Sequence, residues 1–184
     1  MNAAPAITIR RARDADAVAL ALLAADTFVE TFGHLYQPED LANFLATEQT
    51  AVNYRQLIAK PDVGVWVAAG SSGSLIGFLT AGPCKLPVVD REPASGEIRQ
   101  LYLRGSAQGQ GLGSRLLDTG LAWLRDRGRA PLYIGVWSGN SGAQRLYGRY
   151  GFDKVGEYDF PVGNHMDREF ILKERAVAVR GRTS

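Results

Sequence analysis

Hydrophobic and polar residues alternate in several short segments of the chain, which is the pattern of half-buried β-strands. The first segment is Ile7-Thr8-Ile9-Arg10. Segments 63–69 and 75–81 are joined by a Gly/Ser turn and predict a hairpin. Further strands are expected at 97–103, 132–137, 152–160 and 165–172, the last two as an antiparallel pair. The pattern therefore predicts about seven strands.

Apolar residues at helical spacing occupy the stretches between these strands. Asp14 is expected to cap a first helix that ends near Gly33. Two short helices are expected at about 38–45 and 52–59, a longer one at 114–127, and another after Asn140. The long helical connection between strands 97–103 and 132–137 predicts that these two strands are parallel. We therefore predict an α/β fold, a mixed sheet with helices on both faces, in a single domain over residues 1–174.

The segment Gln108-Gly109-Gln110-Gly111-Leu112-Gly113 lies between a predicted strand and a predicted helix. Glycine lets the backbone come close to a ligand, and the first amides of a helix lack partners within the helix. Together with the helix dipole, such amides bind phosphate groups. A nucleotide-like ligand held by its pyrophosphate is therefore expected here.

Two common phosphate motifs do not fit this segment. The nucleoside-triphosphate loop ends in Gly-Lys-Ser/Thr, whereas this chain has Gly113-Ser114-Arg115. The dinucleotide fingerprint requires its third glycine one residue later and an acidic residue about 20 positions downstream, where this chain has the apolar run 131–134.

The remaining pattern is Gln-x-x-Gly-x-Gly, and it resembles the coenzyme A pyrophosphate loop of the GNAT superfamily of N-acetyltransferases. The segment 140–152, Asn-Ser-Gly-Ala-Gln-Arg-Leu-Tyr-Gly-Arg-Tyr-Gly-Phe, is similar to a later motif of that superfamily. The two motifs occur in the family's order and at about its spacing, so the resemblance covers nearly the whole chain.

The resemblance implies acetyl-CoA as cosubstrate and a cleft between two central strands that diverge and hold the pantetheine arm. A backbone amide in 101–103, where the strand is expected to bulge, would stabilise the oxyanion. The residues expected to bind the cofactor are Leu101, Tyr102, Leu103, Gln108, Gly109, Gln110, Gly111, Leu112, Gly113, Ser114, Asn140, Ala143 and Tyr147. Arg104, Arg145 and Arg149 are further candidates for the phosphates, or are solvated charges.

Two side chains are candidates for proton transfer. Tyr147 lies on the same helical face as Asn140 and Ala143, and the resemblance implies that it protonates the departing thiolate. Glu97 precedes Gln108 by the spacing of the catalytic glutamate in the histone-acetylating branch, and a buried glutamate would have the raised pKa of a base. Alternation would place Glu97, Arg99, Leu101 and Leu103 on one face. Tyr147 as a packing residue and Glu97 in a salt bridge are the structural alternatives.

The acceptor side is predicted from the loop around His34. The run from Thr27 to Tyr36 resembles polyamine acetyltransferases of the superfamily, which makes Glu30, His34 and Tyr36 candidate substrate-binding residues. His34 is also a candidate for proton relay, or an ordinary surface histidine. Two isolated histidines do not predict a metal site.

Composition limits the remaining possibilities. The 184 residues are 46% hydrophobic with a net charge of +2, which is globular and too weakly basic to indicate a nucleic-acid or membrane partner. The single cysteine, Cys84, excludes an intramolecular disulfide and fits a cytoplasmic protein. No signal peptide or membrane-spanning run is expected, and a monomer or homodimer fits. The tail from Arg175 to Ser184 is basic and expected to be disordered.

We therefore expect an acetyl-CoA-dependent N-acetyltransferase that acts on a primary amine of a small molecule, possibly a polyamine. Two alternatives remain open. One is a protein N-terminal or lysine acetyltransferase, which would need an open groove. The other is a non-catalytic acyl-CoA-binding module, which would bind without turnover.

Overall fold

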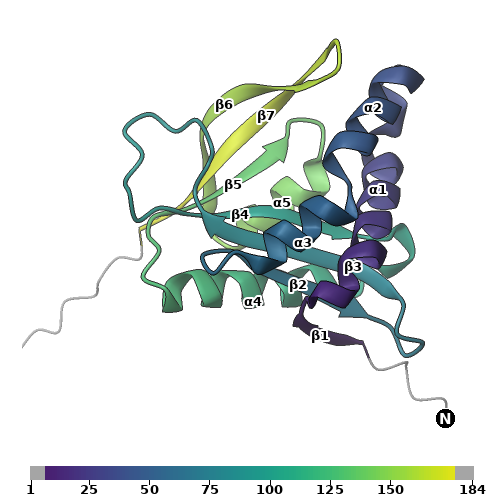
Figure 1. The fold of residues 1–184 in the computed structure, drawn as a ribbon. Coiled ribbons are helices and arrows are strands. Elements are labelled where there is room, and N and C mark those ends of the chain that lie inside the picture. The colour runs from purple at the N-terminus through teal and green to yellow at the C-terminus, as the bar shows by residue number, and fades with distance from the viewer. Residues whose placement is uncertain (1–6, 177–184) are drawn as a thin grey trace, which may run out of the picture.

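A seven-stranded mixed sheet forms the centre of the protein (Figure 1), in a computed structural model that describes residues 7–176. The strand order is β1-β2-β3-β4-β5-β7-β6. Only β4 and β5 are parallel neighbours, and all other pairs of this sheet are antiparallel. The predicted fold class is thus confirmed. The strands are β1 (Thr8–Arg11), β2 (Gly64–Ala69), β3 (Leu75–Pro83), β4 (Gly96–Leu103), β5 (Leu132–Trp137), β6 (Phe152–Val162) and β7 (His165–Glu174).

Helices cover both faces of this sheet (Figure 1). Their bounds are α1 (Ala17–Phe32), α2 (Pro38–Glu48), α3 (Ala51–Ala59), α4 (Leu112–Asp126) and α5 (Ser141–Arg149). On one face α1 and α3 pack against Val65, Val67 and Phe78. On the other, α4 and α5 pack against their sequence neighbours in the same strands, such as Ala68 and Leu79. The period of two along each strand therefore divides the core into two layers.

The first helix begins later than its sequence predicts. Asp14 does not cap α1; residues Asp14–Asp16 form a short 3₁₀ helix, and α1 starts at Ala17. Asp16 accepts a hydrogen bond from the Arg13 amide at 2.7 Å and pairs with Arg10 of β1 at 2.7 Å. These contacts tie the 3₁₀ turn before α1 to the edge strand.

The segment Asp14–Leu35, which contains α1, has 22 residues and includes an 18-residue window with a mean hydropathy of 1.4. By length and composition alone it would suffice to cross a membrane, contrary to the expectation from the sequence. One side of the helix packs against the protein core, while Val18, Leu22 and Val29 are exposed. On the packed side, Leu20 and Leu23 are fully buried against the sheet, and Phe28 and Phe32 pack on other aromatic rings. This helix is a core element of the domain.

The chain after β7 is tied to the domain at its first residue. Arg175 pairs with Asp153 at 2.9 Å, and its amide donates to the Gly151 carbonyl at 2.9 Å. The rest of the predicted tail, from residue 177, lies outside the described residues.

The centre of the sheet contains two irregularities. Strands β4 and β5 pair over only three positions, Gly96–Ile98 with Leu132–Ile134, although both strands continue. Against β3, Ala81 pairs with Ile98 but Thr80 pairs with Gln100, so Arg99 is an extra, bulged residue. The bulge was expected at 101–103 and lies two residues earlier.

The bulge also corrects the predicted alternation. Ile98, Leu101 and Leu103 face α4, whereas Tyr102 packs on Phe78 and Phe32 across the sheet. The extra residue at Arg99 inverts the phase of the strand, so Glu97 does not share a face with Leu101 and Leu103.

We predict that Gly120 of α4 cannot carry a side chain without cost. A Cβ there would lie 2.6 Å from Leu79 Cδ2 and 2.9 Å from Ile98 Cδ1, both fully buried side chains. A Cβ on Gly148 of α5, by contrast, would meet no atom within 4 Å. Alanine favours a helix over glycine by about 1 kcal/mol, but overpacking costs about 1–3 kcal/mol.

Denaturant unfolding should therefore give Gly120→Ala a free energy of unfolding at least about 1 kcal/mol below that of Gly148→Ala. Equal stability of the two variants would contradict the close packing of α4 on the sheet.

Candidate active site

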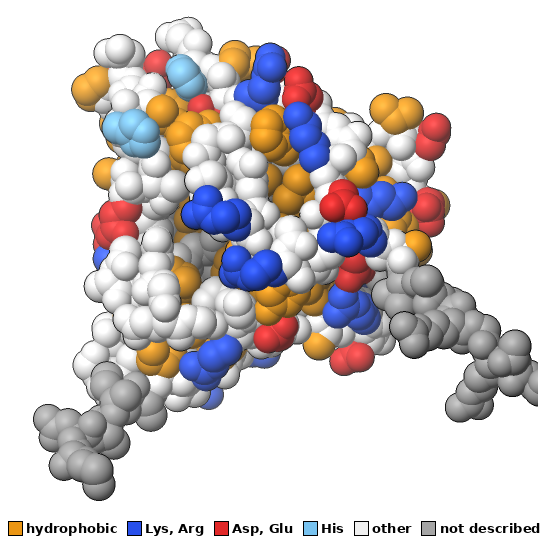
Figure 2. Space-filling model, turned by 180° about the vertical axis from the view of Figure 1, so that it is seen from behind, with side chains coloured by type: hydrophobic (Ala, Val, Ile, Leu, Met, Phe, Trp, Pro, Cys, Tyr) orange, Lys and Arg blue, Asp and Glu red, His pale blue; other side chains and the backbone are white. Residues whose placement is uncertain are grey.

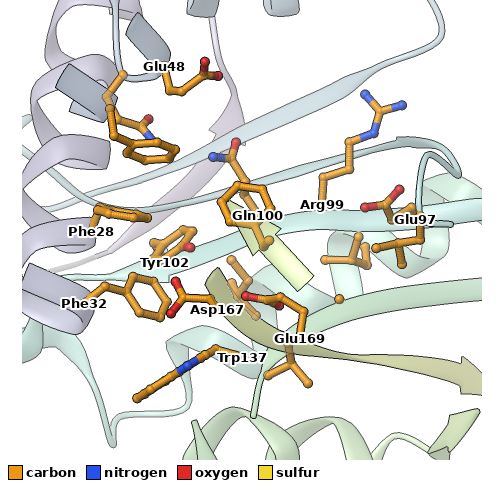
Figure 3. A pocket seen from close by; sticks show the side chains of 18 of the residues that line it. Phe28, Phe32, Glu48, Glu97, Arg99, Gln100, Tyr102, Trp137, Asp167 and Glu169 are labelled. Carbon is orange, nitrogen blue, oxygen red and sulfur yellow. The ribbon is translucent and has the colours of Figure 1, made fainter. Parts of the chain in front are cut away.

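A cleft of about 740 Å³ opens where β4 and β5 diverge (Figure 3). Its wall includes Phe28 and Phe32 from α1 and Tyr147 from α5, helices that lie on opposite faces of the sheet. The cleft therefore passes through the plane of the sheet between the two central strands. Groups that approach from the two faces can meet inside it.

Tyr147 reaches the cleft from the α5 side. Asn140 caps α5 by accepting a hydrogen bond from the Ala143 amide at 3.0 Å, and Asn140, Ala143 and Tyr147 all line the cleft, as their common helical face predicts. The Tyr147 side chain is 5% exposed. Burial, and secondly the charge of Glu169, raises the pKa of its hydroxyl. The phenol is therefore protonated at neutral pH and can donate its proton.

Glu97 lies in the cleft wall on β4 and is also buried. Its Oε2 accepts a hydrogen bond from the Lys85 amide at 2.6 Å, which holds the loop after β3. Burial raises the pKa of this carboxyl, while the bond from Lys85 opposes the shift. Glu97 thus has a structural contact in addition to its predicted position at the site.

Two acidic residues of β7 line the same cleft, although the sequence reasoning did not select them. Asp167 and Glu169 project from this strand into the cavity (Figure 3). Asp167 is buried, accepts a very short hydrogen bond from the Tyr36 hydroxyl, and pairs with His165 Nε2 at 3.2 Å. Burial, and then the charge of Asp167, raises the pKa of Glu169 to about 7. Their spacing of two was the available signal, since it places both on one strand face.

Aromatic rings surround the acceptor end of the cleft. Phe28 lies between Phe32, Tyr36 and Phe44, with ring centroids 4.6–5.8 Å away, and Phe32 meets the edge of Trp137 at 5.6 Å. Of the three predicted substrate-binding residues, Glu30, His34 and Tyr36, only Tyr36 lines the cleft. Such rings provide apolar walls and faces that attract cations.

The glycine-rich segment lies at the start of α4. Gly109 and Gly111 have φ of 73° and 74°, a region that side chains disfavour, and a Cβ on either would meet nothing within 4 Å. Gly111 is the N-cap and supplies no capping side chain, so the next amides, from Leu112 to Ser114, point out of the helix without a cap. Gly113 packs beside Leu146 of α5, which places these amides near the α5 side of the cleft. This geometry fits a pyrophosphate group.

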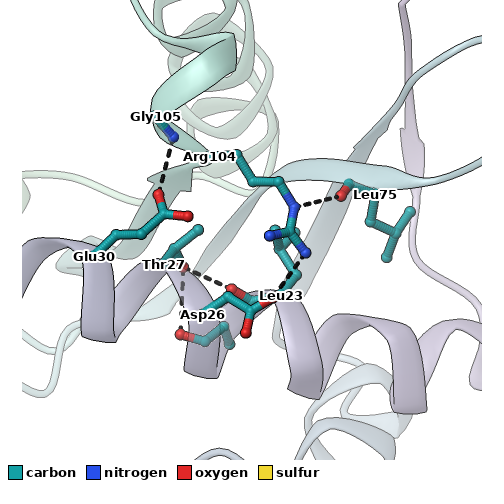
Figure 4. A network of polar contacts seen from close by, with 8 residues as sticks. Leu23, Asp26, Thr27, Glu30, Leu75, Arg104 and Gly105 are labelled. Atoms are coloured by element: carbon teal, nitrogen blue, oxygen red, sulfur yellow. Dashed lines mark hydrogen bonds and ion pairs between the residues drawn. The ribbon is translucent and has the colours of Figure 1, made fainter.

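Glu30 and Arg104 belong to a polar network outside the cleft (Figure 4). Glu30 Oε2 accepts from the Gly105 amide at 3.0 Å, and Arg104 pairs with Asp26 at 2.9 Å and donates to the Leu75 carbonyl. These contacts fix α1 to the turn that precedes the glycine-rich segment. The geometry thus gives Glu30 a structural role, and Arg104 already has partners.

The other predicted contacts lie on the surface. His34 is exposed, does not line the cleft, and meets the edge of Trp137 at 6.4 Å. Figure 2 shows both histidines at the surface, and several Lys and Arg side chains gathered on the same face. Arg145 and Arg149 of α5 are exposed, so their possible contact with phosphates stays a prediction.

The model of the acetyltransferase (GNAT) family matches residues 24–152 of this chain. The chain belongs to the acetyltransferase (GNAT) family. It is 33% identical to the N-acetyltransferase in the pepI 3′ region of Lactobacillus delbrueckii subsp. lactis, over 84% of this chain and 89% of that protein. The predicted family and enzyme class, N-acetyltransferase, are thereby confirmed.

Solved structures of GNAT proteins share the fold. The paia N-acetyltransferase of Thermoplasma acidophilum, in complex with coenzyme A, superposes with a TM-score of 0.73 at 20% identity, over 92% of this chain and 99% of that one. The acetyltransferase yncA of Salmonella typhimurium, with its cofactor acetyl-CoA, has a TM-score of 0.64 at 24% identity, over 96% and 99%. Both carry the cosubstrate predicted here or its free coenzyme.

Proposed function

We propose that this GNAT protein transfers the acetyl group of acetyl-CoA to a primary amine of a small molecule by direct attack in a ternary complex. The observation that carries the proposal is the cleft through the sheet, which is lined by α1 on one face and α5 on the other. Donor and acceptor can enter from opposite faces and meet between β4 and β5, without an acyl-enzyme intermediate.

The start of α4, which lies beside α5, suits the donor. The uncapped amides after Gly111 would hold the pyrophosphate, with the positive end of the helix dipole. Beyond Ile98, β4 and β5 are not paired with each other, so their facing backbone groups can bond the amides of the pantetheine arm. Tyr147 would then lie beside the thioester sulfur.

The α1 side suits a compact amine. Phe28, Phe32 and Tyr36 close around Val162 of the β6–β7 hairpin, and the Asn164 amide donates to Asp40 of α2 at 3.3 Å. These contacts roof the acceptor end, whereas a peptide substrate would need an open groove. Glu48, Glu97, Asp167 and Glu169 in the wall favour a cation, and they support a polyamine, which carries several ammonium groups, as the acceptor.

The chemical step follows from these positions. The neutral amine attacks the thioester carbonyl, a C–N bond forms, and the C–S bond breaks. The attacking nitrogen loses one proton as the amide forms, and Tyr147 protonates the departing sulfur. A thiol has an ordinary pKa near 8.5 and a phenol near 10, so donation helps mainly while charge builds on sulfur in the transition state.

An assay of coenzyme A release tests the function directly. Purified protein with acetyl-CoA is offered polyamines, small aliphatic amines, amino acids, aminoglycosides and peptides in turn. We expect turnover with small amines, and the highest kcat/KM with those that carry two or more ammonium groups. Preference for peptides, or tight acetyl-CoA binding without turnover on any amine, would contradict the proposal.

We predict that a negative charge at Gly111 prevents acetyl-CoA binding. Asp and Asn both tolerate the left-handed backbone and are nearly equal in size, so they differ chiefly in charge. By calorimetry, Gly111→Asp should bind acetyl-CoA at least about tenfold more weakly than Gly111→Asn. Added salt should reduce this difference in affinity, because it screens the repulsion between the aspartate and the pyrophosphate. If the two variants have the same melting temperature and bind acetyl-CoA equally well, the pyrophosphate does not bind at this segment.

For Tyr147, the informative change is Tyr147→Phe, which keeps the buried ring and removes the proton. General-acid catalysis contributes about 10²–10⁴-fold, and water can replace part of it, so kcat should fall at least about tenfold. Melting temperature and acetyl-CoA affinity should change little, because the packing is preserved. A wild-type kcat in this variant would show that Tyr147 only packs.

A further inference from the structure

The carboxylates inside the cleft differ in what they already bind. Asp167 accepts from the Tyr36 hydroxyl and pairs with His165, and Glu97 accepts from the Lys85 amide. Glu169 is half-buried, and it accepts no hydrogen bond from any residue in 7–176. Its pKa is raised only by burial and by the charge of Asp167. Its lone pairs are therefore free for a ligand, since an unpartnered carboxylate attracts any donor that enters the cleft.

Glu169 also lies at the opening between β4 and β5, where the proposed function brings donor and acceptor together. Glu169 pairs with Trp137 at the end of β5, and a Cβ on Gly135 would lie 4.0 Å from Glu169 Oε2 and 3.3 Å from Tyr158 Oη. The carboxyl group thus lies over β5 beyond its last pairing with β4, at the opening through the sheet. Tyr147 enters the same opening from α5 and is close enough for the charge of Glu169 to act on it.

We propose that Glu169 is a catalytic residue that binds the acceptor ammonium and takes its proton, so that the neutral amine can attack. This inference rests on the proposed N-acetyltransferase function and assigns the base that the sequence had placed at Glu97, His34 or water. Tyr147 and Glu169 then act from opposite sides of the thioester.

The protons balance in this scheme. The ammonium gives one proton to a Glu169 oxygen and becomes a neutral amine. Its nitrogen then forms the C–N bond, the C–S bond breaks, and the sulfur receives the Tyr147 proton. The second nitrogen proton restores the Tyr147 hydroxyl through solvent. The Glu169 proton leaves to solvent, so the sum is one amide, one thiol and one released proton.

The surroundings set the pH at which Glu169 works. A base acts only when ionised, and the burial of Glu169 in the cleft raises its pKa to about 7, so activity should rise with pH through about 7. A primary ammonium keeps a pKa near 10.4 over this range and needs a base throughout. The other ionisable groups that line the cleft are Tyr36, Glu48, Tyr54, Lys60, Glu97, Arg99, Tyr102, Tyr147, Tyr158 and Asp167.

The test compares wild type, Glu169→Gln, Glu97→Gln and Asp159→Asn, the last removing an exposed charge from the same hairpin. The kcat/KM of each is measured from pH 6 to 9 with an alkyl amine, pKa about 10.4, and an α-amino amide, pKa about 7.7–8.0. Glu169→Gln should lower kcat/KM about 10²-fold for the alkyl amine at pH 7 and less for the amide, and lose the rise near pH 7. Glu97→Gln and Asp159→Asn should keep that rise.

Three results would overturn the assignment. The first is a kcat/KM of Glu169→Gln that still rises near pH 7 as in wild type. The second is a kcat/KM that Glu169→Gln lowers equally for both amines. The third is loss of the rise near pH 7 in Glu97→Gln instead of in Glu169→Gln. If wild type acetylates no amine, the proposed function fails. Calorimetry of alkylammonium binding at pH 8 then decides whether Glu169 belongs to an ammonium-binding site. Loss of binding in Glu169→Gln but not in Asp159→Asn would support the site, and unchanged or absent wild-type binding would overturn it.

Melting temperature gives a readout that is independent of turnover. A carboxyl whose pKa is raised in the folded state stabilises the protein below its ordinary pKa, and that stability is lost as pH rises through the folded pKa. Glu169→Gln should therefore match wild type at about pH 4, below the ordinary pKa of a glutamate, and melt at a higher temperature at about pH 8.5, above the folded pKa. A variant that melts lower at both values would indicate a packing role and overturn the assignment.

Discussion

The divergence of β4 and β5 is the constraint on which the rest of the structure depends. Two parallel neighbours at the centre of a sheet normally pair along their length, yet here the pairing stops at Ile98 and Ile134. The bulge at Arg99 accompanies this break, because an unpaired extra residue bends β4 locally. Backbone groups beyond the break lose their ladder partners, and buried backbone groups require others. An extended ligand with its own amides would be a suitable partner, which is why the proposed function places the pantetheine arm at this break.

The same opening brings together side chains that an intact sheet would separate. Tyr147 belongs to the core layer beneath α4 and α5, whereas Tyr102 and the aromatic cluster belong to the layer beneath α1. Each reaches the cleft because the strands between them have parted. Asp26 and Glu30 of α1 also hold Arg104 and Gly105, so this helix both lines the cleft and fixes the turn before the glycine-rich segment proposed to bind the donor. One rigid element thus sets the distance between the two halves of the site.

The sequence predicted most of what depends on neighbours along the chain, although Asp14 does not cap α1 as expected. Strand and helix order, the cap at Asn140, the common face of Asn140 and Tyr147, and the glycine-rich start of α4 all follow from local spacing. It placed the bulge wrongly, because a bulge in β4 is set by its register with β3, a contact between separate segments. For the same reason Asp167 and Glu169 were missed. Their spacing shows that they share a face, but only the order β5-β7-β6 shows that this face lines the cleft. The acceptor contacts assigned to Glu30 and His34 came from a resemblance in the segment 27–36, and these two side chains do not line the cleft, although Tyr36 of the same segment does.

The site has an energetic cost that the core offsets. Burial raises the pKa of Glu97, Tyr147 and Glu169 alike, so one cause, the exclusion of water from the cleft, acts on all three. It keeps the phenol of Tyr147 protonated, as proton donation requires, and it raises the pKa of Glu169 to about 7, so that this carboxyl is ionised, as proton removal requires, only above that pH. The same burial destabilises the folded protein whenever Glu169 ionises. The fully buried leucines of α4, on the far side of the sheet from the acidic wall, supply apolar burial where no chemistry is needed. The ring of Tyr147 belongs to the same buried cluster, so the packing that stabilises the fold also holds the proposed proton donor at the opening between β4 and β5.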